Sequence, residues 1–250
     1  MPLLAEQAAK ARKLLAVLQE PEYRRALRHG VAASVEHEAM PLRGDFLTVI
    51  DAGANKGQFA TFAARRFPRA ALLCFEPLPE AAARLRRAVG NVRRLKLWNV
   101  ALGAADEQAE FHVSAADDSS SLLAIGARQR EEFPGTAERT TTKVDVRRLD
   151  GLLEPNDLEN PVLLKIDVQG GELAVLQGAE AILASIDAVL VEVSFVELYT
   201  GQALADAVWD HLRRHGFSCR GVWSMTYGRS GECLQGDLLF ARVGFEPLAV

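Results

Sequence analysis

The chain has 250 residues, of which 49% are hydrophobic and 25% are charged, and it carries a net charge of −4. These values are ordinary for a globular protein with a sizeable core, and the acidic balance argues against a nucleic-acid partner held through phosphate contacts. Three cysteines without C-x-x-C spacing exclude a zinc knuckle and a dense disulfide framework, so we expect a cytoplasmic protein.

Helical periodicity dominates the first part of the chain. Apolar residues recur at helical spacing through residues 3–29, so we predict an N-terminal helical cap over residues 1–45. Charged residues interrupt the segment 1–18, which excludes a signal peptide and a membrane span there.

From Phe46 onward, short apolar runs alternate with amphipathic helices. We predict strands at 46–51, 71–76, 94–99, 162–168, 188–193, 218–223 and 236–242, and helices at about 56–66, 79–89, 172–183 and 203–215. The segment between the last two strands is short and rich in turn residues, so these strands form a hairpin and run antiparallel. The prediction is one α/β domain over 46–250 with a doubly wound, mostly parallel seven-stranded sheet and an antiparallel C-terminal hairpin strand.

A long polar segment interrupts this alternation. Short strands at 110–114 and 142–146 flank it, and we predict a loop insertion over 115–141. Structureless loops of this length inside a domain are usually functional lids or disordered segments. His112, in the strand before the insertion, is a candidate for taking a proton from a substrate, although a lone histidine is more often structural.

The stretch 48–59 joins the first strand to the first helix by a tight turn. Gly53 and Gly57 lack a Cβ, so the backbone of this turn can lie flush against a nucleoside. A dinucleotide site would carry G-x-G-x-x-G and hold a pyrophosphate here, but the carboxylate of Asp51 would repel phosphates. It suits a cation such as S-adenosylmethionine, which has an ammonium and a sulfonium. The alternative is that Asp51 caps the helix and Gly53 is an ordinary turn residue.

Four predicted strands end on or near a carboxylate, namely Asp51, Glu76, Asp167 and Glu192. Because ligands of open α/β sheets bind beyond the carboxyl ends of the strands, these acids predict a ring of negative charge around a ligand crevice. Glu76, at the end of the second strand, is the candidate acceptor for ribose hydroxyls. Asn99 is either the edge of an adenine pocket or a turn residue.

Lys165 and Asp167 lie on the same face of an otherwise apolar strand. A buried charge is costly unless it is paired, so each needs a partner, and a Lys165–Glu192 ion pair across adjacent strands is one possibility. For Asp167 we favour a functional role. It is either a general base for a hydroxyl acceptor or, together with Glu192, a ligand of Mg²⁺, and the sequence does not separate these options.

Three stretches together resemble the FkbM family of S-adenosylmethionine-dependent methyltransferases: residues 49–59, Phe75-Glu76-Pro77 with 99–102, and residues 164–172. The resemblance implies a class I methyltransferase (Rossmann-like) fold and methylation of a hydroxyl on a sugar or secondary metabolite. The candidate cofactor-binding residues are Asp51, Gly53, Asn55, Gly57, Glu76 and Asn99, and the candidate catalytic residues are Asp167, Lys165 and His112.

Two other classes remain open. A nicotinamide-dependent oxidoreductase would share the fold class but would need the second glycine pair that is missing here. A non-catalytic S-adenosylmethionine-binding protein would keep Asp51 and Glu76 but would not need Asp167 and Lys165. The expected partner is a small-molecule or glycan hydroxyl acceptor, and the sequence leaves a homo-oligomer open.

Overall fold

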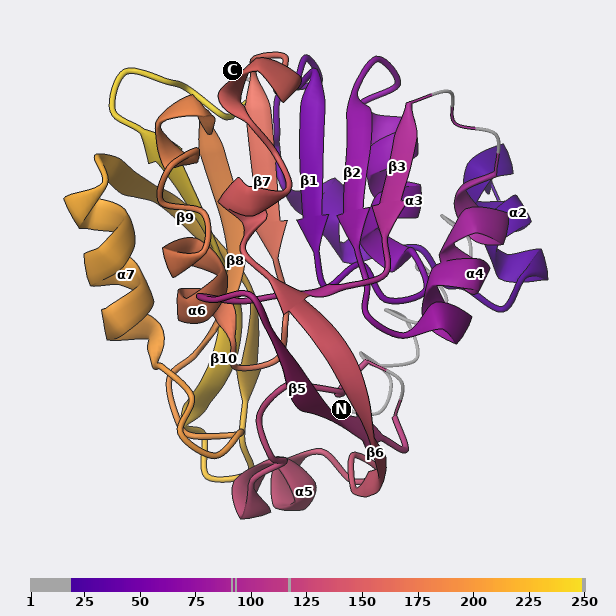
Figure 1. The fold of residues 1–250 in the computed structure, drawn as a ribbon, viewed down its shortest axis with the longest axis vertical. Coiled ribbons are helices and arrows are strands. Elements are labelled where there is room, and N and C mark those ends of the chain that lie inside the picture. The colour runs from indigo at the N-terminus through magenta and orange to yellow at the C-terminus, as the bar shows by residue number, and fades with distance from the viewer. Residues whose placement is uncertain (1–18, 91, 93, 117, 249–250) are drawn as a thin grey trace.

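A seven-stranded sheet forms the centre of the computed structural model, which describes residues 19–90, 92, 94–116 and 118–248 (Figure 1). The strands follow the order β3-β2-β1-β7-β8-β10-β9. Their bounds are β1 (Thr48–Ala52), β2 (Ala71–Phe75), β3 (Leu95–Trp98), β7 (Val162–Ile166), β8 (Ala188–Ser194), β9 (Phe217–Tyr227) and β10 (Cys233–Arg242). β10 is antiparallel to both of its neighbours, whereas the pairs among β3, β2, β1, β7 and β8 are parallel. The predicted fold class is confirmed.

Helices cover both faces of this sheet because successive strand residues, which point to opposite faces, are apolar. Val49 and Leu72 pack with α3 (Gln58–Arg66) and α4 (Pro79–Val89), which α2 (Pro21–Arg28) contacts from outside. Ile50 and Leu73 pack on the other face with α6 (Glu172–Gln177) and α7 (Ala205–Arg214). The part of the predicted N-terminal helix that falls in residues 3–18 lies outside the described residues, and the division of the chain at residue 46 stays a prediction.

The helix predicted over 172–183 is shorter than expected. α6 ends at Gln177, and a Cβ at the following Gly178 would lie 2.0 Å from the carbonyl oxygen of Gly103. The chain therefore passes against another backbone segment at this point. A short 3-10 helix, η4 (Leu183–Ser185), completes the connection to β8.

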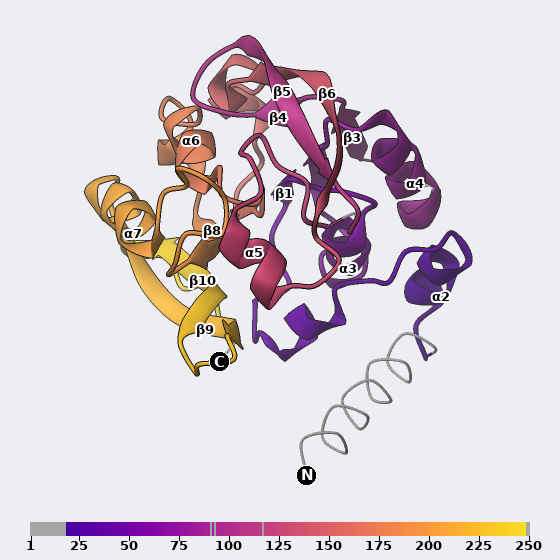
Figure 2. The same ribbon diagram turned by 90° about the horizontal axis from the view of Figure 1, so that it is seen from below.

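A second sheet was not predicted. It has the order β4-β6-β5 and consists of β4 (Ala101–Leu102), β5 (Glu107–Ser114) and β6 (Glu138–Arg147). The antiparallel strands β5 and β6 are connected by residues 115–137, which contain α5 (Ala127–Glu132), so the predicted loop insertion 115–141 ends too late and its last residues belong to β6. A bridge between Ile125 and Tyr199 ties it to the segment after β8. Figures 1 and 2 show the second sheet and α5 across the end of the molecule where the parallel strands of the main sheet terminate.

The cysteines behave as the sequence predicts. All three are free, and Cys74 is a fully buried core residue of β2. Within the described part of the chain, every helix is too short or too polar to cross a membrane.

Candidate active site

A cavity of ≈ 720 Å³ lies at the carboxyl ends of the parallel strands. Its volume is within the range of small-molecule and cofactor sites. The loops after β1, β2 and β7 form one side of it, the second sheet and the insertion form another, and residues 32–37 close a third. The chain therefore places a ligand-sized space where open α/β sheets bind their ligands.

Strained backbone is concentrated around this cavity. Asn55, Gln169 and Ser224 are the non-glycine residues with positive φ in the described chain, at 46°, 58° and 50°. All three line the cavity. Such conformations each cost about 1–3 kcal/mol and cluster at functional sites, where the surrounding structure holds them in place. The distribution of strain therefore marks the cavity as the candidate active site.

Glu76 has the hydrogen-bonding pattern expected of a ribose-binding carboxylate. It follows β2 and lines the cavity, and its two oxygens accept the backbone N–H groups of Asn55 at 2.9 Å and Leu78 at 2.8 Å. A carboxylate offers about four lone-pair positions, so these bonds leave a free position on each oxygen. Burial raises the pKa of Glu76 to about 7, although the two backbone N–H groups oppose the rise.

The prediction that Asp51 projects into the ligand crevice is corrected. Asp51 is only 1% exposed and lies outside the cavity wall. Its nearest charged contact is Lys165, whose Nζ lies 3.7 Å from Oδ1, and neither carboxylate oxygen has a hydrogen-bond partner among the described residues. Burial raises the pKa of Asp51 to about 6, against the attraction of Lys165. Asp51 therefore acts on the cavity through Lys165, which does line it.

The two glycines of the first turn face protein atoms. Gly53 has φ +81°, and a Cβ there would lie 1.9 Å from the carbonyl oxygen of Asp167. Gly57 has φ +92°, and its Cβ would lie 2.9 Å from Cγ of Leu85 in α4. At both glycines the space that we predicted for a nucleoside is therefore taken by other atoms of the protein. Gly53 nevertheless lines the cavity.

Lys165 pairs with Asp167 and not with Glu192, which the sequence had left as one possibility, and an amide links Asp167 to Glu192. Lys165 Nζ lies 3.1 Å from Asp167 Oδ2. The side-chain amide of Gln169 donates to Asp167 Oδ1 at 2.7 Å and to Glu192 Oε2 at 3.0 Å. Gln235 donates to the remaining oxygen, Glu192 Oε1, at 2.8 Å. Asp167 follows Lys165 by two residues, and Asp51 is its register partner on the neighbouring strand β1. Both carboxyl groups are therefore within reach of the Lys165 ammonium.

These contacts do not fit the predicted Mg²⁺ site at Asp167 and Glu192. The amide nitrogen of Gln169 bridges Asp167 Oδ1 and Glu192 Oε2, so N–H groups already lie between the two carboxylates, where a shared cation would have to bind. The amide of Gln169 is fixed in this orientation because the Tyr199 hydroxyl donates to its Oε1 at 2.7 Å. We therefore assign no metal to this pair.

The same contacts separate the acidities of the two carboxyl groups. Burial acts to raise the pKa of Asp167, but the Lys165 ammonium and the Gln169 amide outweigh it and hold that pKa below its ordinary value. Burial, reinforced by the charges of Asp167 and Asp237, raises the pKa of Glu192 well above its ordinary value.

His37 and Asp237 also line the cavity, and the sequence reasoning missed both. His37 lies in η1 (Val35–Ala39), with Nδ1 3.3 Å from the carbonyl oxygen of Ser34 and Nε2 3.9 Å from Asp237 Oδ2. Burial lowers the pKa of His37 in spite of Asp237, and burial raises the pKa of Asp237 in spite of His37. Asp237 carried a usable signal, since it is an acid inside an apolar strand, but nothing in the sequence around His37 pointed to the cavity.

The structure does not bring Asn99 or His112 to the cavity. Asn99 is exposed and donates to the backbone carbonyl of Glu76 at 3.3 Å, so it supports that loop from outside. His112 lies in the second sheet, where its Nδ1 is 2.6 Å from Glu138 Oε2. Neither residue belongs to the cavity lining.

Comparison with known proteins identifies the family. The family model described as "Methyltransferase FkbM domain" matches residues 51–219. The 2-O-methyltransferase NoeI of Sinorhizobium fredii is 33% identical over 170 residues, which cover 66% of this chain and 70% of NoeI. The 31-O-demethyl-FK506 methyltransferase FkbM of Streptomyces tacrolimicus is 32% identical over 216 residues, covering 77% of this chain and 76% of that protein.

The fold is also found in a solved structure. A putative S-adenosylmethionine-dependent methyltransferase from Listeria monocytogenes superposes with a TM-score of 0.50 at 10% identity, covering 83% of this chain and 96% of that one. This similarity concerns the fold alone. The extent of the family match decides against the nicotinamide-dependent oxidoreductase, and the chain belongs to the FkbM family of methyltransferases.

Proposed function

We propose that this protein transfers the methyl group of S-adenosylmethionine to a hydroxyl oxygen of a sugar or secondary-metabolite acceptor. One observation carries the proposal. A single cavity is lined at one point by Glu76, whose carboxylate has free acceptor positions, and at another by the His37–Asp237 pair, which can handle a proton. The names of the two O-methyltransferase relatives support a hydroxyl acceptor.

The residues around the cavity fit this cofactor. Glu76 would accept the ribose hydroxyls, and the turn after β1 would approach the cofactor with its backbone. The acids Asp51, Asp167, Glu192 and Asp237 surround Lys165, so the site favours a ligand with positive charge. When bound, S-adenosylmethionine supplies an activated methyl group, so the protein has to align the acceptor, exclude water and manage the hydroxyl proton.

His37 is better placed than Asp167 to take that proton. Both oxygens of Asp167 are engaged and its pKa is held low, which makes it a weak base. The Nδ1–H of neutral His37 donates to Ser34, which leaves the Nε2 lone pair on the side of Asp237. A hydroxyl whose oxygen lies about 2.8 Å from Nε2 would donate its one proton to this lone pair, with the Asp237 carboxyl group beside it.

In this arrangement each residue of the site has a distinct role. His37 Nε2 accepts the hydroxyl proton, and the carboxylate of Asp237 stabilises the imidazolium that results. Lys165 and the Gln169 amide hold Asp167 and Glu192 in position at the ends of β7 and β8. Phe59 packs against the edge of the His37 ring with centroids 5.2 Å apart, so the imidazole has little freedom to turn away.

The experiment measures cofactor binding and turnover separately. We expect the full chain to bind S-adenosylhomocysteine in calorimetry, to show no heat with NAD, and to form S-adenosylhomocysteine from S-adenosylmethionine with members of a panel of hydroxylated sugars and metabolites. His37→Asn should lower kcat about 10²–10⁴-fold with little change in S-adenosylhomocysteine affinity. In the parent enzyme kcat/KM should fall as pH decreases through the pKa of His37, which lies below 6.5, and this limb should vanish in the variant.

The non-catalytic alternative gives a different result. A protein that only binds the cofactor would bind S-adenosylhomocysteine but methylate no acceptor of the panel. If turnover occurs and its acidic limb survives in His37→Asn, another residue is the base. If Asp167 were the base, that limb would lie below the ordinary carboxyl range, because the pKa of Asp167 is lowered.

A further inference from the structure

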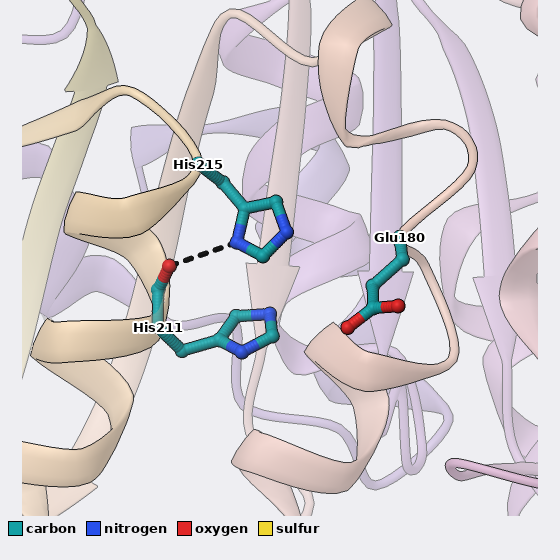
Figure 3. A group of neighbouring side chains, drawn as sticks. All are labelled: Glu180, His211 and His215. Atoms are coloured by element: carbon teal, nitrogen blue, oxygen red, sulfur yellow. Dashed lines mark hydrogen bonds between the residues drawn. The ribbon is translucent and has the colours of Figure 1, made fainter.

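Glu180, His211 and His215 form a side-chain cluster away from the cavity (Figure 3). His211 lies in the last turn of α7 and His215 caps its C-terminus, whereas Glu180 belongs to the turn that follows α6. α7 follows β8 and leads back to the start of β9, so its C-terminus lies at the amino ends of the parallel strands. The cluster is therefore at the opposite end of the sheet from the candidate active site, and none of its residues lines the cavity.

The three side chains are grouped closely enough to offer their ligand atoms to one metal ion. One possible ligand atom from each of the three side chains lies within 4.8 Å of the other two. The i, i+4 spacing of the histidines places them on one face of α7, with ring centroids 4.4 Å apart. Figure 3 shows the Nε2 sides of both rings directed toward the carboxylate of Glu180.

The hydrogen bonds of the two histidines leave nitrogen lone pairs available. His215 Nδ1 donates to the backbone carbonyl of His211 at 2.9 Å, which fixes the ring and leaves Nε2 as the ligand atom. Metal-binding histidines are commonly oriented by this kind of outer bond. His211 is only 6% exposed, and its Nε2 is buried without a hydrogen-bond partner among the described residues. A buried polar atom without a partner is unfavourable, and a metal ion would supply the missing interaction.

We propose that Glu180, His211 and His215 bind one Zn²⁺ ion. Two imidazole nitrogens and one carboxylate oxygen are a common protein ligand set for zinc, and the exposure of Glu180 leaves the outer coordination position to water. The ion joins the C-terminus of α7 to the turn after α6, two segments that lie far apart in the sequence. Because it would link these two segments, the bound ion would stabilise this end of the fold.

The test uses the full chain, freed of metal and of any oligohistidine tag, and titrated with Zn²⁺. We expect saturable binding of one ion per chain, a rise in the midpoint of thermal unfolding, and visible absorption bands of a four-coordinate site when Co²⁺ replaces Zn²⁺. Glu180→Gln and His215→Gln should each lower the Zn²⁺ affinity at least about tenfold. Both variants change residues that are exposed or half-buried, and circular dichroism checks their folding.

Matched controls exclude binding by surface side chains in general. His29→Gln and Glu131→Gln change exposed residues of the same types elsewhere, and both should bind Zn²⁺ like the parent. The proposal is overturned if no saturable one-to-one binding occurs, or if Glu180→Gln and His215→Gln bind as tightly as the controls. Methyl transfer is not used as the readout, so the outcome does not depend on the proposed function.

Discussion

Gly53→Ala tests the conclusion that the turn after β1 is packed against the protein's own backbone. The added Cβ would lie 1.9 Å from the carbonyl oxygen of Asp167, and real Cβ atoms essentially never come closer than 3.0 Å, so the two segments must separate by at least 1.1 Å (3.0 − 1.9). The backbone N–H of the same residue, Asp167, donates to the carbonyl oxygen of Ala52 at 3.1 Å, and this bond is worth about 1 kcal/mol net. The left-handed φ of +81° adds about 1–2 kcal/mol for a residue with a Cβ.

Gly201→Ala is the matched control for the backbone conformation. Gly201 has φ +75°, and a Cβ there would meet nothing within 4 Å, so the variant carries the conformational cost without the collision. In urea unfolding followed by circular dichroism, we expect Gly201→Ala to lose about 1–2 kcal/mol and Gly53→Ala about 3–5 kcal/mol. Gly53→Ala should also lose turnover, because Asp167 must move. Equal free energies of unfolding for the two variants would refute the reasoning.

Four further predictions concern polar groups in and around the cavity. Glu76→Gln should weaken S-adenosylhomocysteine binding by about 1.5–3 kcal/mol in calorimetry. The carboxyl of Glu76 has a pKa raised to about 7, so the parent loses folding stability as pH rises from about 4.5 to 7, and ligand-free Glu76→Gln should gain relative stability over this window in pH-dependent unfolding. Tyr199→Phe removes the bond that fixes the Gln169 amide, so kcat should fall while S-adenosylhomocysteine affinity stays, and Tyr227→Phe, at an exposed tyrosine, should change neither. Near pH 6.5, the protein should release more protons when it binds S-adenosylmethionine than when it binds S-adenosylhomocysteine, because the sulfonium lowers the pKa of nearby acids such as Asp51. Proton release is measured as the dependence of the calorimetric binding heat on the buffer. Equal release with the two ligands would contradict this prediction.

The strands and helices of the main sheet could be predicted because their signals are local. The apolar run predicted as a strand at 46–51 is β1 (Thr48–Ala52), and the helix predicted at 79–89 is α4, with a proline in its first turn and a glycine after its last. The second sheet could not be predicted as such. The first half of β5 is largely exposed and polar, so it lacks the apolar alternation of a buried strand, and its partner β6 follows only after the long insertion.

For the candidate site, the sequence predicted which strands contribute residues but not how those residues pair. Residues at the ends of parallel strands must gather at one edge, which is why the acids at Glu76, Asp167 and Glu192 do line one cavity. Their partners depend on the reach of neighbouring side chains. Lys165 therefore pairs with Asp167 and Asp51, and His37 arrives from a segment that tertiary packing alone brings to the cavity.

The surplus of acids around the cavity has a chemical rationale in the proposed reaction. Methyl transfer from a sulfonium removes a positive charge from the cofactor, and proton transfer to His37 creates one on the imidazole. Both charges lie within the field of the same carboxylates, since Asp167 and Asp237 each act electrostatically on His37. The net charge inside the cavity is therefore conserved during the reaction, and the acids that attract the cationic donor also stabilise the imidazolium. The neutral sulfur of the product loses that attraction, so the site that favours binding of the donor also favours release of the product.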